Sequence, residues 1–323
     1  MTAQRAPVAA PARSRHLLSA ADVAGIGLER LLDAADELRA GRRSGTLPQP
    51  LAGKQVALLF EKPSLRTRTT FDVGIQALGG HPIYLGPEEV GIGHRETAAD
   101  IGRNLSRWVD AIVIRTFAHA TLAELAEATS VPVINALDER EHPCQALADL
   151  QTLRQRRGTL MGLTLAFVGD GNNVCHSLLL AGALAGMRLR VATPAVFEPN
   201  ATVVAEARRI GQSTGASVSI GPDPVEAVAR ADAVYTDVWT SMGAEDHAAA
   251  RRTLFAGFQV NEALMAHAPG ALVMHCLPAH RGEEISAGVL DGPSSVVLEQ
   301  AENRLYVQQA LLVELLAAGG ADS

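Results

Sequence analysis

The chain has 323 residues, of which 47% are hydrophobic, and a formal net charge of −7 at pH 7. This length suffices for two domains with their own cores, taking roughly 150 residues per domain. The acidic balance disfavours nucleic acid as a partner, and no apolar run reaches the roughly 18 residues that a membrane-spanning helix needs. We therefore expect a soluble enzyme or small-molecule-binding protein without a nucleic-acid or membrane partner.

The N-terminal segment and the cysteines indicate a compartment. Residues 1–15 are rich in Ala, Pro and Arg and lack the apolar core of a secretory signal, so we expect a disordered tail. The three cysteines, Cys144, Cys175 and Cys276, are odd in number, far apart and without Cys-x-x-Cys spacing. They indicate neither a disulfide framework nor a cysteine zinc site, which is typical of the reduced cytoplasm.

Residues 16–145 predict a first α/β domain. From His16 to Gly41 the apolar residues recur at helical spacing, and Ser19 with Asp22 resembles a capping box. Strands and helices then alternate. Strands are predicted at 56–60, 82–85, 111–115 and 131–135, and helices up to 78, over 97–108 and over 122–128. Such alternation predicts a parallel sheet that is covered on both faces.

Residues 146–300 predict a second, similar domain. A helix over 143–156 ends near Gly158 and leads into strands at 163–168, 189–192, 217–220, 233–236 and 271–275. The strand-like residues 295–298 precede a final helix over about 304–316, within a C-terminal segment, 301–323, that we expect to pack back on the first domain. The fold class is therefore α/β, with two doubly wound parallel-sheet domains of similar size joined by interdomain helices.

An anion site is predicted directly after the first strand. Ser64-Leu65-Arg66-Thr67-Arg68 opens a helix, where free backbone N–H groups, hydroxyls and guanidinium groups together favour a phosphate. The alternative is an ordinary serine N-cap followed by two surface arginines.

Other polar clusters follow the ends of strands, where ligands of parallel sheets bind. Gly169-x-Gly171 is similar to a dinucleotide motif and keeps an NAD-dependent oxidoreductase as an alternative, but Val174 occupies the third glycine position. His142 alone is more often a helix cap than a catalytic group, and Cys276 alone more often a small core residue. A metal held by His275, Cys276 and His280 lacks any known zinc spacing, so we expect none.

Taken in order along the chain, these clusters resemble the aspartate/ornithine transcarbamylase family, and within it the ornithine branch. Ser64-Leu65-Arg66-Thr67-Arg68 is similar to the family's carbamoyl phosphate signature, and His142-Pro143-Cys144-Gln145 to its carbamoyl-contacting motif. Glu302-Asn303-Arg304 is similar to its late arginine. Asp237-x-x-x-Ser241-Met242-Gly243 and His275-Cys276-Leu277-Pro278 resemble the ornithine enzymes specifically.

The resemblance implies transfer of a carbamoyl group from carbamoyl phosphate to the δ-amine of L-ornithine, giving L-citrulline and phosphate without a cofactor. It implies catalytic roles for Arg115, His142 and Cys276. The residues implied to bind carbamoyl phosphate are Ser64, Leu65, Arg66, Thr67, Arg115, His142, Gln145, Cys276, Leu277 and Arg304. The residues implied to bind ornithine are Asn173, Asp237, Ser241 and Met242. It also implies a homotrimer or a multiple of trimers, and a role in arginine synthesis or, in reverse, in arginine breakdown.

Two departures from the family pattern affect the phosphate site. Leu65 stands where threonine is common, and Gly91 stands where a glutamine commonly reaches a neighbouring subunit. Alternatives within the family are transferases for aspartate, putrescine or acylated ornithine, against which Asp237 favours a free α-amino acid. A non-catalytic binding paralogue is disfavoured by the intact polar set.

Overall fold

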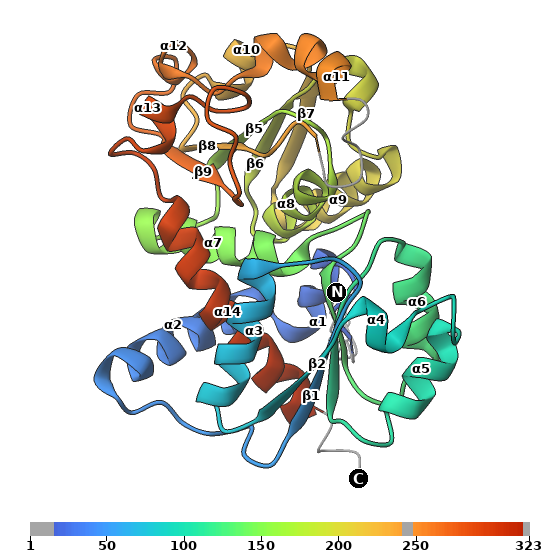
Figure 1. The fold of residues 1–323 in the computed structure, drawn as a ribbon. Coiled ribbons are helices and arrows are strands. Elements are labelled where there is room, and N and C mark those ends of the chain that lie inside the picture. The colour runs from blue at the N-terminus through green and yellow to red at the C-terminus, as the bar shows by residue number, and fades with distance from the viewer. Residues whose placement is uncertain (1–15, 241–247, 319–323) are drawn as a thin grey trace, which may run out of the picture.

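The computed structural model describes residues 16–240 and 248–318, which form two α/β domains stacked end to end (Figure 1). The expected fold class is confirmed, because each domain contains one sheet whose paired strands all run parallel. In the part of the chain that is described, no helix combines the length and the apolar character needed to cross a bilayer.

The two sheets place their carboxyl ends toward the middle of the molecule. The first sheet has the strand order β2-β1-β3-β4 and the second the order β7-β6-β5-β8-β9. The strands of the first sheet are β1 (Gln55–Phe60), β2 (His81–Leu85), β3 (Ala111–Arg115) and β4 (Val133–Leu137). Those of the second are β5 (Thr164–Val168), β6 (Arg188–Ala192), β7 (Ser217–Gly221), β8 (Ala233–Thr236) and β9 (Leu272–His275). Three of the central strands, β3, β5 and β8, are buried throughout, as expected for sheets covered on both faces.

The helices cover both faces of these sheets. In the first domain they are η1 (Ala20–Asp22), α1 (Val23–Ile26), α2 (Leu28–Ser44), α3 (Leu65–Ala77), α4 (Pro87–Val90), α5 (Ala98–Leu105) and α6 (His119–Ala128). In the second they are α8 (Asn173–Leu184), η2 (Ala195–Phe197), α9 (Ala201–Thr214), α10 (Pro224–Val228), α11 (Ala248–Phe255), η4 (Ala256–Phe258), α12 (Glu262–Met265) and α13 (Ala287–Leu290).

Two further helices connect the domains, α7 (Pro143–Arg157) and α14 (Val297–Ala318). In Figure 1, α7 lies across the waist of the molecule, and α14 runs from the second domain back along α2 and α3 of the first. Every residue of α7 from Pro143 to Leu153 is buried. Because Gln145, Asp149 and Gln151 are among them, these polar side chains require hydrogen-bond partners inside the protein.

Most predicted elements are present, with one break inside a helical segment and several shifted ends. The helical segment from His16 is interrupted at Gly27, whose φ of 93° breaks it between α1 and α2. The capping box of Ser19 and Asp22 is confirmed. The prediction that 295–298 is strand-like is wrong, because Ser295 forms only an isolated bridge to Val273 and Val297 already begins α14. Strand β4 begins at Val133, two residues later than predicted.

Candidate active site

A cavity of about 880 Å³ lies between the two domains, beyond the carboxyl ends of their strands. Its wall includes all the site residues expected from the sequence whose positions are described. These are Ser64, Leu65, Arg66, Thr67, Arg115, His142, Gln145, Asn173, Asp237, Cys276, Leu277 and Arg304. Ser241 and Met242, also expected to bind ornithine, lie outside the described residues. Residues from 64 to 304 in the sequence therefore meet at one place.

The start of α3 forms one end of the cavity. Ser64 precedes the helix in extended conformation, and its side chain makes no capping hydrogen bond, so the simple N-cap interpretation is wrong. The hydroxyl and the free N–H groups of the first turn therefore remain available to an anion at the cavity wall. Leu65 is 78% exposed and offers that anion its backbone only.

Three guanidinium groups, those of Arg66, Arg115 and Arg304, surround this helix start. Arg304 donates from Nη2 to Thr67 Oγ1 at 2.7 Å and from Nη1 to Gln145 Oε1 at 2.5 Å, and both acceptors are neutral. Within the described residues, none of the three arginines forms an ion pair. Burial, with Arg304 and Arg66 nearby, lowers the pKa of Arg115 to about 10. The site thus holds cationic charge that a dianion would neutralise.

His142 begins α7 and contributes a neutral imidazole. Burial and then the charges of Arg304 and Arg115 hold the pKa of His142 well below its ordinary value. Its backbone N–H donates to Ser177 Oγ at 2.9 Å. Its Nδ1 is buried without a hydrogen-bond partner among the described residues. The ring is therefore uncharged at neutral pH and has one nitrogen that can donate a hydrogen bond to a ligand.

The opposite wall carries a carboxylate, Asp237, at the end of β8. Asp237 accepts hydrogen bonds from Asn172 Nδ2 at 2.7 Å, from Cys276 Sγ at 2.9 Å and from the N–H of Val238 at 2.8 Å. Desolvation and the adjacent Asp237 raise the pKa of Cys276 well above its ordinary value. Cys276 is therefore a protonated thiol that donates to the carboxylate, and it is unsuited to act as a thiolate nucleophile.

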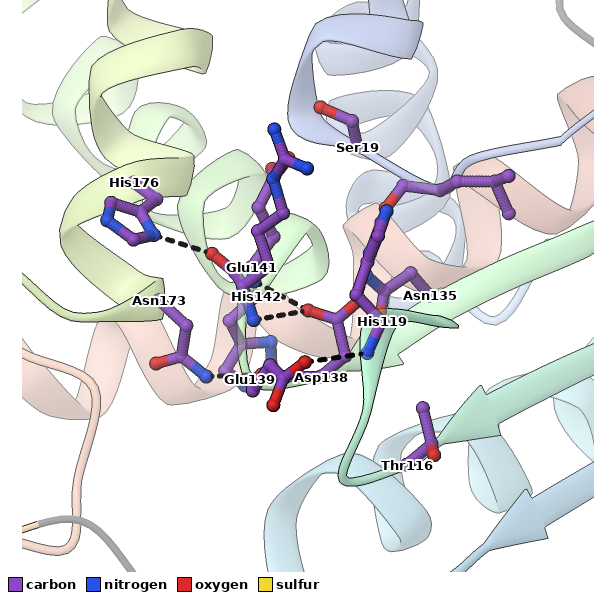
Figure 2. Close-up of polar contacts among 12 residues, drawn as sticks. Ser19, Thr116, His119, Asn135, Asp138, Glu139, Glu141, His142, Asn173 and His176 are labelled. Atoms are coloured by element: carbon purple, nitrogen blue, oxygen red, sulfur yellow. Dashed lines mark hydrogen bonds and ion pairs between the residues drawn. The ribbon is translucent and has the colours of Figure 1, made fainter. Parts of the chain in front are cut away.

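Asn173, at the start of α8, ties the second domain to the loop before α7 (Figure 2). Its Nδ2 donates to the carbonyl oxygen of Asp138 at 2.7 Å. The Asp138 side chain holds that loop by accepting from the N–H groups of Arg140 and Glu141, at 2.8 and 2.6 Å, and by pairing with His119 at 2.7 Å. The hydrogen bonds of Asp138 thus hold in place the loop that precedes His142.

The site predicted from the sequence omits several polar side chains at or beside the cavity, among them those of Lys62, Arg252 and Asn172. Lys62 lines it and lies 4.2 Å from the ring centroid of Phe117, and burial followed by Arg115 lowers the pKa of Lys62. Arg252 lines the rim and pairs with Glu283 at 3.1 Å. Asn172 caps α8 and orients Asp237. Lys62 could have been found, since it is one of only two lysines and lies two residues before Ser64.

The structure also bears on the cofactor alternatives. A Cβ added at Gly171 would meet the backbone of Phe197 and Pro199 at 2.6 and 2.4 Å, so the protein's own chain fills the space beside this glycine. Asp237, His275 and Cys276 lie close enough to share a metal ion. However, both ring nitrogens of His275 are already engaged, by Glu284 at 3.1 Å and by the N–H of Leu277 at 2.8 Å. This residue set therefore does not favour a metal.

The fold and the cavity define a two-substrate enzyme, in which one α/β domain presents an anion site and the other faces it with a carboxylate. Comparison with known families agrees. Residues 15–155 match the profile "Aspartate/ornithine carbamoyltransferase, carbamoyl-P binding domain", and residues 161–315 match the profile "Aspartate/ornithine carbamoyltransferase, Asp/Orn binding domain". The chain belongs to the aspartate/ornithine carbamoyltransferase family, as its motifs predicted.

Relatives within this family place the chain near the ornithine enzymes. It is 54% identical over 305 residues to an ornithine carbamoyltransferase of Parafrankia sp., covering 94% of this chain and 96% of that protein. The solved ornithine carbamoyltransferase of Pyrococcus furiosus is 45% identical with a TM-score of 0.90, covering 94% of this chain and 97% of that one. The one from Thermus thermophilus is 46% identical with a TM-score of 0.83, covering 94% and 99%.

Proposed function

We propose that this protein transfers the carbamoyl group of carbamoyl phosphate to the δ-amine of L-ornithine, giving L-citrulline and phosphate. The observation that carries this proposal is the cavity itself. Three arginines that form no ion pair with any described residue stand on one side, and the Asp237 carboxylate with the Cys276 thiol stands on the other. A dianionic donor and a cationic amino acid fit these two sides in only one orientation.

The phosphate of the donor would bind at the start of α3. The backbone N–H groups of the first turn, the hydroxyls of Ser64 and Thr67, and the guanidinium groups converge there. Because phosphate is the leaving group, these contacts also stabilise the charge that develops on it as the C–O bond breaks. We assign residues 16–145 to this substrate, together with Arg304 of the C-terminal helix.

The carbamoyl group would lie between His142 and Gln145. The neutral imidazole can donate a hydrogen bond to the carbamoyl oxygen, which becomes an oxyanion when the amine attacks. Gln145 Oε1, which accepts from Arg304, can also accept from the carbamoyl nitrogen through its second lone pair. No covalent bond to the protein is needed, since the substrate supplies the nucleophile.

Ornithine would bind in the second domain, residues 146–300, with its α-ammonium on Asp237. That contact leaves the δ-amine free to point toward the carbamoyl carbon, near Cys276. The raised pKa of Cys276 and its hydrogen bond to Asp237 support a role in orienting the substrate and disfavour a role as base. Asn173, Ser241 and Met242 complete the proposed ornithine site.

Assembly and cellular role are further parts of the proposal. We propose a homotrimer or a multiple of it, in which a neighbouring subunit covers the exposed Leu65 at the cavity rim. We also propose a cytoplasmic enzyme of arginine metabolism, and the three unpaired cysteines are consistent with a reducing compartment. Sedimentation at equilibrium tests the assembly, and a monomer that is fully active would contradict it.

The substrate assignment is tested by measuring carbamoylation of a panel of amines with carbamoyl phosphate as donor. The panel contains L-ornithine, N-acetylornithine, putrescine and L-aspartate. We expect citrulline from ornithine at a kcat/KM at least about 10²-fold above the others, because Asp237 requires a free α-ammonium partner. A preference for putrescine would overturn the choice of substrate. Failure to carbamoylate any of the four would overturn the proposed activity.

A further inference from the structure

Asp149 is a buried carboxylate that the proposed chemistry leaves unused. It lies on α7, one turn after Gln145, and is fully buried. Its Oδ1 accepts two amide hydrogens, from Gln145 Nε2 at 2.8 Å and from Gln300 Nε2 at 2.8 Å. Because an ionised carboxylate only accepts, both glutamines must turn their nitrogens toward Asp149 and their oxygens away from it.

On one side this arrangement determines the direction of the Gln145 amide. With Nε2 held by Asp149, Oε1 points toward Arg304 and accepts from Nη1 at 2.5 Å. The same guanidinium reaches Thr67 in the first turn of α3. Because the guanidinium of Arg304 has donors only, Arg304 and Asp149 favour the same orientation of the Gln145 amide, and removal of Asp149 leaves Nε2 without this acceptor.

On the other side Asp149 reaches the segment that carries Cys276. Gln300, in the first turn of α14, uses its Oε1 to accept the N–H of His275 at 3.0 Å. The His275 ring accepts the N–H of Leu277 through Nδ1 at 2.8 Å, and its Nε2 meets Glu284 at 3.1 Å. The backbone N–H groups of His275 and Leu277, on either side of Cys276, are thus linked to Asp149 Oδ1. The link runs through the buried side chains of His275 and Gln300.

The charge around Asp149 argues against a purely stabilising role. Burial raises the pKa of Asp149 to about 6, against the hydrogen bonds and the charge of Arg304 that favour the ionised form. The other titratable groups facing it are Tyr235 of β8 and Cys276. Its Oδ2 is buried without a hydrogen-bond partner among the described residues. A buried carboxylate that forms no ion pair among the described residues costs free energy to desolvate, which its hydrogen bonds to Gln145 and Gln300 offset only in part, so we look to the site for its role.

We propose that Asp149 is a positioning residue for carbamoyl transfer, which directs the Gln145 amide toward the carbamoyl group and holds the 275–277 segment opposite it. This inference rests on the proposed function. Asp149 touches neither substrate. Its contribution is made in the transition state, where the carbamoyl nitrogen and the attacking amine must both be aligned.

The test compares Asp149→Leu, which has similar size but no acceptor, with Asp149→Asn, which keeps one acceptor oxygen. Both are made in the full chain, and kcat and KM for citrulline formation are measured beside the binding of inorganic phosphate by calorimetry. We expect Asp149→Leu to lower kcat about 10²-fold and Asp149→Asn less than tenfold. Phosphate affinity should change less than threefold, because the phosphate contacts lie on α3 and the arginines.

Thr152→Val is the matched control. Thr152 is buried one turn further along α7 and accepts from Asn303 of α14 at 2.9 Å, so its loss weakens the same helix contact away from Gln145. We expect it to lower the melting temperature and leave kcat within about twofold. Gln300→Met cuts only the second hydrogen bond of Asp149 and should lower kcat about tenfold. It decides the question if Asp149→Leu does not fold.

The outcomes separate this inference from the proposed function. If the wild-type protein makes no citrulline, the proposed function fails. If the wild type is active and a folded Asp149→Leu or Gln300→Met has normal kcat, the positioning role is wrong. Loss of phosphate binding together with kcat in both Asp149 variants would also overturn it, because that result indicates general disruption of the site.

Discussion

The two walls of the cavity carry opposite charges and differ in how their charged groups are paired. The cationic wall combines residues of three distant segments, Arg66, Arg115 and Arg304, of which Arg304 donates to neutral oxygens of Gln145 and Thr67. The acidic wall has one carboxylate, Asp237, which accepts hydrogen bonds from the amide of Asn172, the thiol of Cys276 and the N–H of Val238. Neither wall is neutralised by the other across the cavity, within the residues that are described.

This difference between the walls indicates that the binding of the anionic substrate gains more free energy from charge neutralisation than the binding of the amino acid. Crowded guanidinium groups disfavour one another, which is visible in the pKa of Arg115, lowered to about 10 by burial and by Arg304 and Arg66. A dianion relieves that repulsion when it binds, so the cationic wall is poised for its ligand before the amino acid arrives. The Asp237 carboxylate already accepts three hydrogen bonds, so it gains less free energy when its ligand binds. We therefore expect the phosphate substrate to bind first.

Removing one guanidinium of the cationic wall should have the largest effect on activity. We expect Arg66→Ala to lower kcat/KM for citrulline formation by about 10³-fold, because its charge acts on a phosphate that gains charge as it leaves. Steady-state kinetics with both substrates measure this. Arg68→Ala is the control, since Arg68 lies outside the cavity wall and stacks 3.4 Å from the ring centroid of Tyr84. If Arg68→Ala were the more damaging change, the phosphate would be held elsewhere.

The buried anion between the walls should make stability depend on pH. The pKa of Asp149 is raised from 3.8 to about 6, so the folded state binds its proton more tightly than the unfolded state. Ionisation above pH 6 therefore costs about 3 kcal/mol of stability, and this cost disappears as the pH falls through 6 toward 4. Urea unfolding at several pH values gives the free energy of unfolding as a function of pH. Between pH 4 and 6, the slope of this free energy against pH should be less negative for Asp149→Asn than for the wild type. Identical slopes would contradict this assignment.

Altering the acidic wall should affect one substrate only. We expect Asp237→Asn to raise the KM for ornithine about 10²-fold, because the α-ammonium loses its charged partner. Inorganic phosphate binding, measured by calorimetry, should remain unchanged. Asp170→Asn serves as control, since Asp170 already pairs with Arg251 and its change should raise this KM less than tenfold. An equal loss of phosphate affinity in Asp237→Asn would mean that the walls are not independent.

Cys276→Ser tests whether the thiol of Cys276 orients the substrate or reacts with it. A hydroxyl is smaller than a thiol but can still donate to Asp237, so we expect kcat to fall about tenfold with some weakening of ornithine binding. Mass spectrometry during turnover should detect no carbamoylated protein. Unchanged turnover and unchanged ornithine affinity would show that Cys276 has no role in the mechanism. A carbamoylated Cys276 would show that the enzyme uses covalent catalysis and that Cys276 does more than orient the substrate.

The smallest effect is expected at Leu65, the residue that departs from the family pattern. Its side chain is 78% exposed, so Leu65→Thr adds a hydroxyl without disturbing the core. We expect the affinity for carbamoyl phosphate to change less than threefold, since the backbone N–H contributes in both forms. Competition calorimetry with inorganic phosphate is a suitable measurement. A change of tenfold or more would show that the hydroxyl is an essential ligand.

Local sequence patterns were sufficient for the strands of both sheets and for most of the polar residues at their ends. Buried strands followed by Arg115 or Asp237 are short-range features, and parallel sheets bring such ends together by geometry alone. The hydrogen bonds of Asp149 were not predictable, because Gln300 lies 151 residues away and only the packing of α14 on α7 brings it near. Likewise, the extension of α14 to Val297 overrides a locally strand-like sequence.

The position of Arg304 in the chain has a consequence for protein synthesis. A nascent chain that has been translated only as far as β9 already contains Ser64, Arg66, Arg115, His142 and Asp237, but not the guanidinium that joins Thr67 to Gln145. Until α14 leaves the ribosome and docks between α2, α3 and α7, the anion site is incomplete.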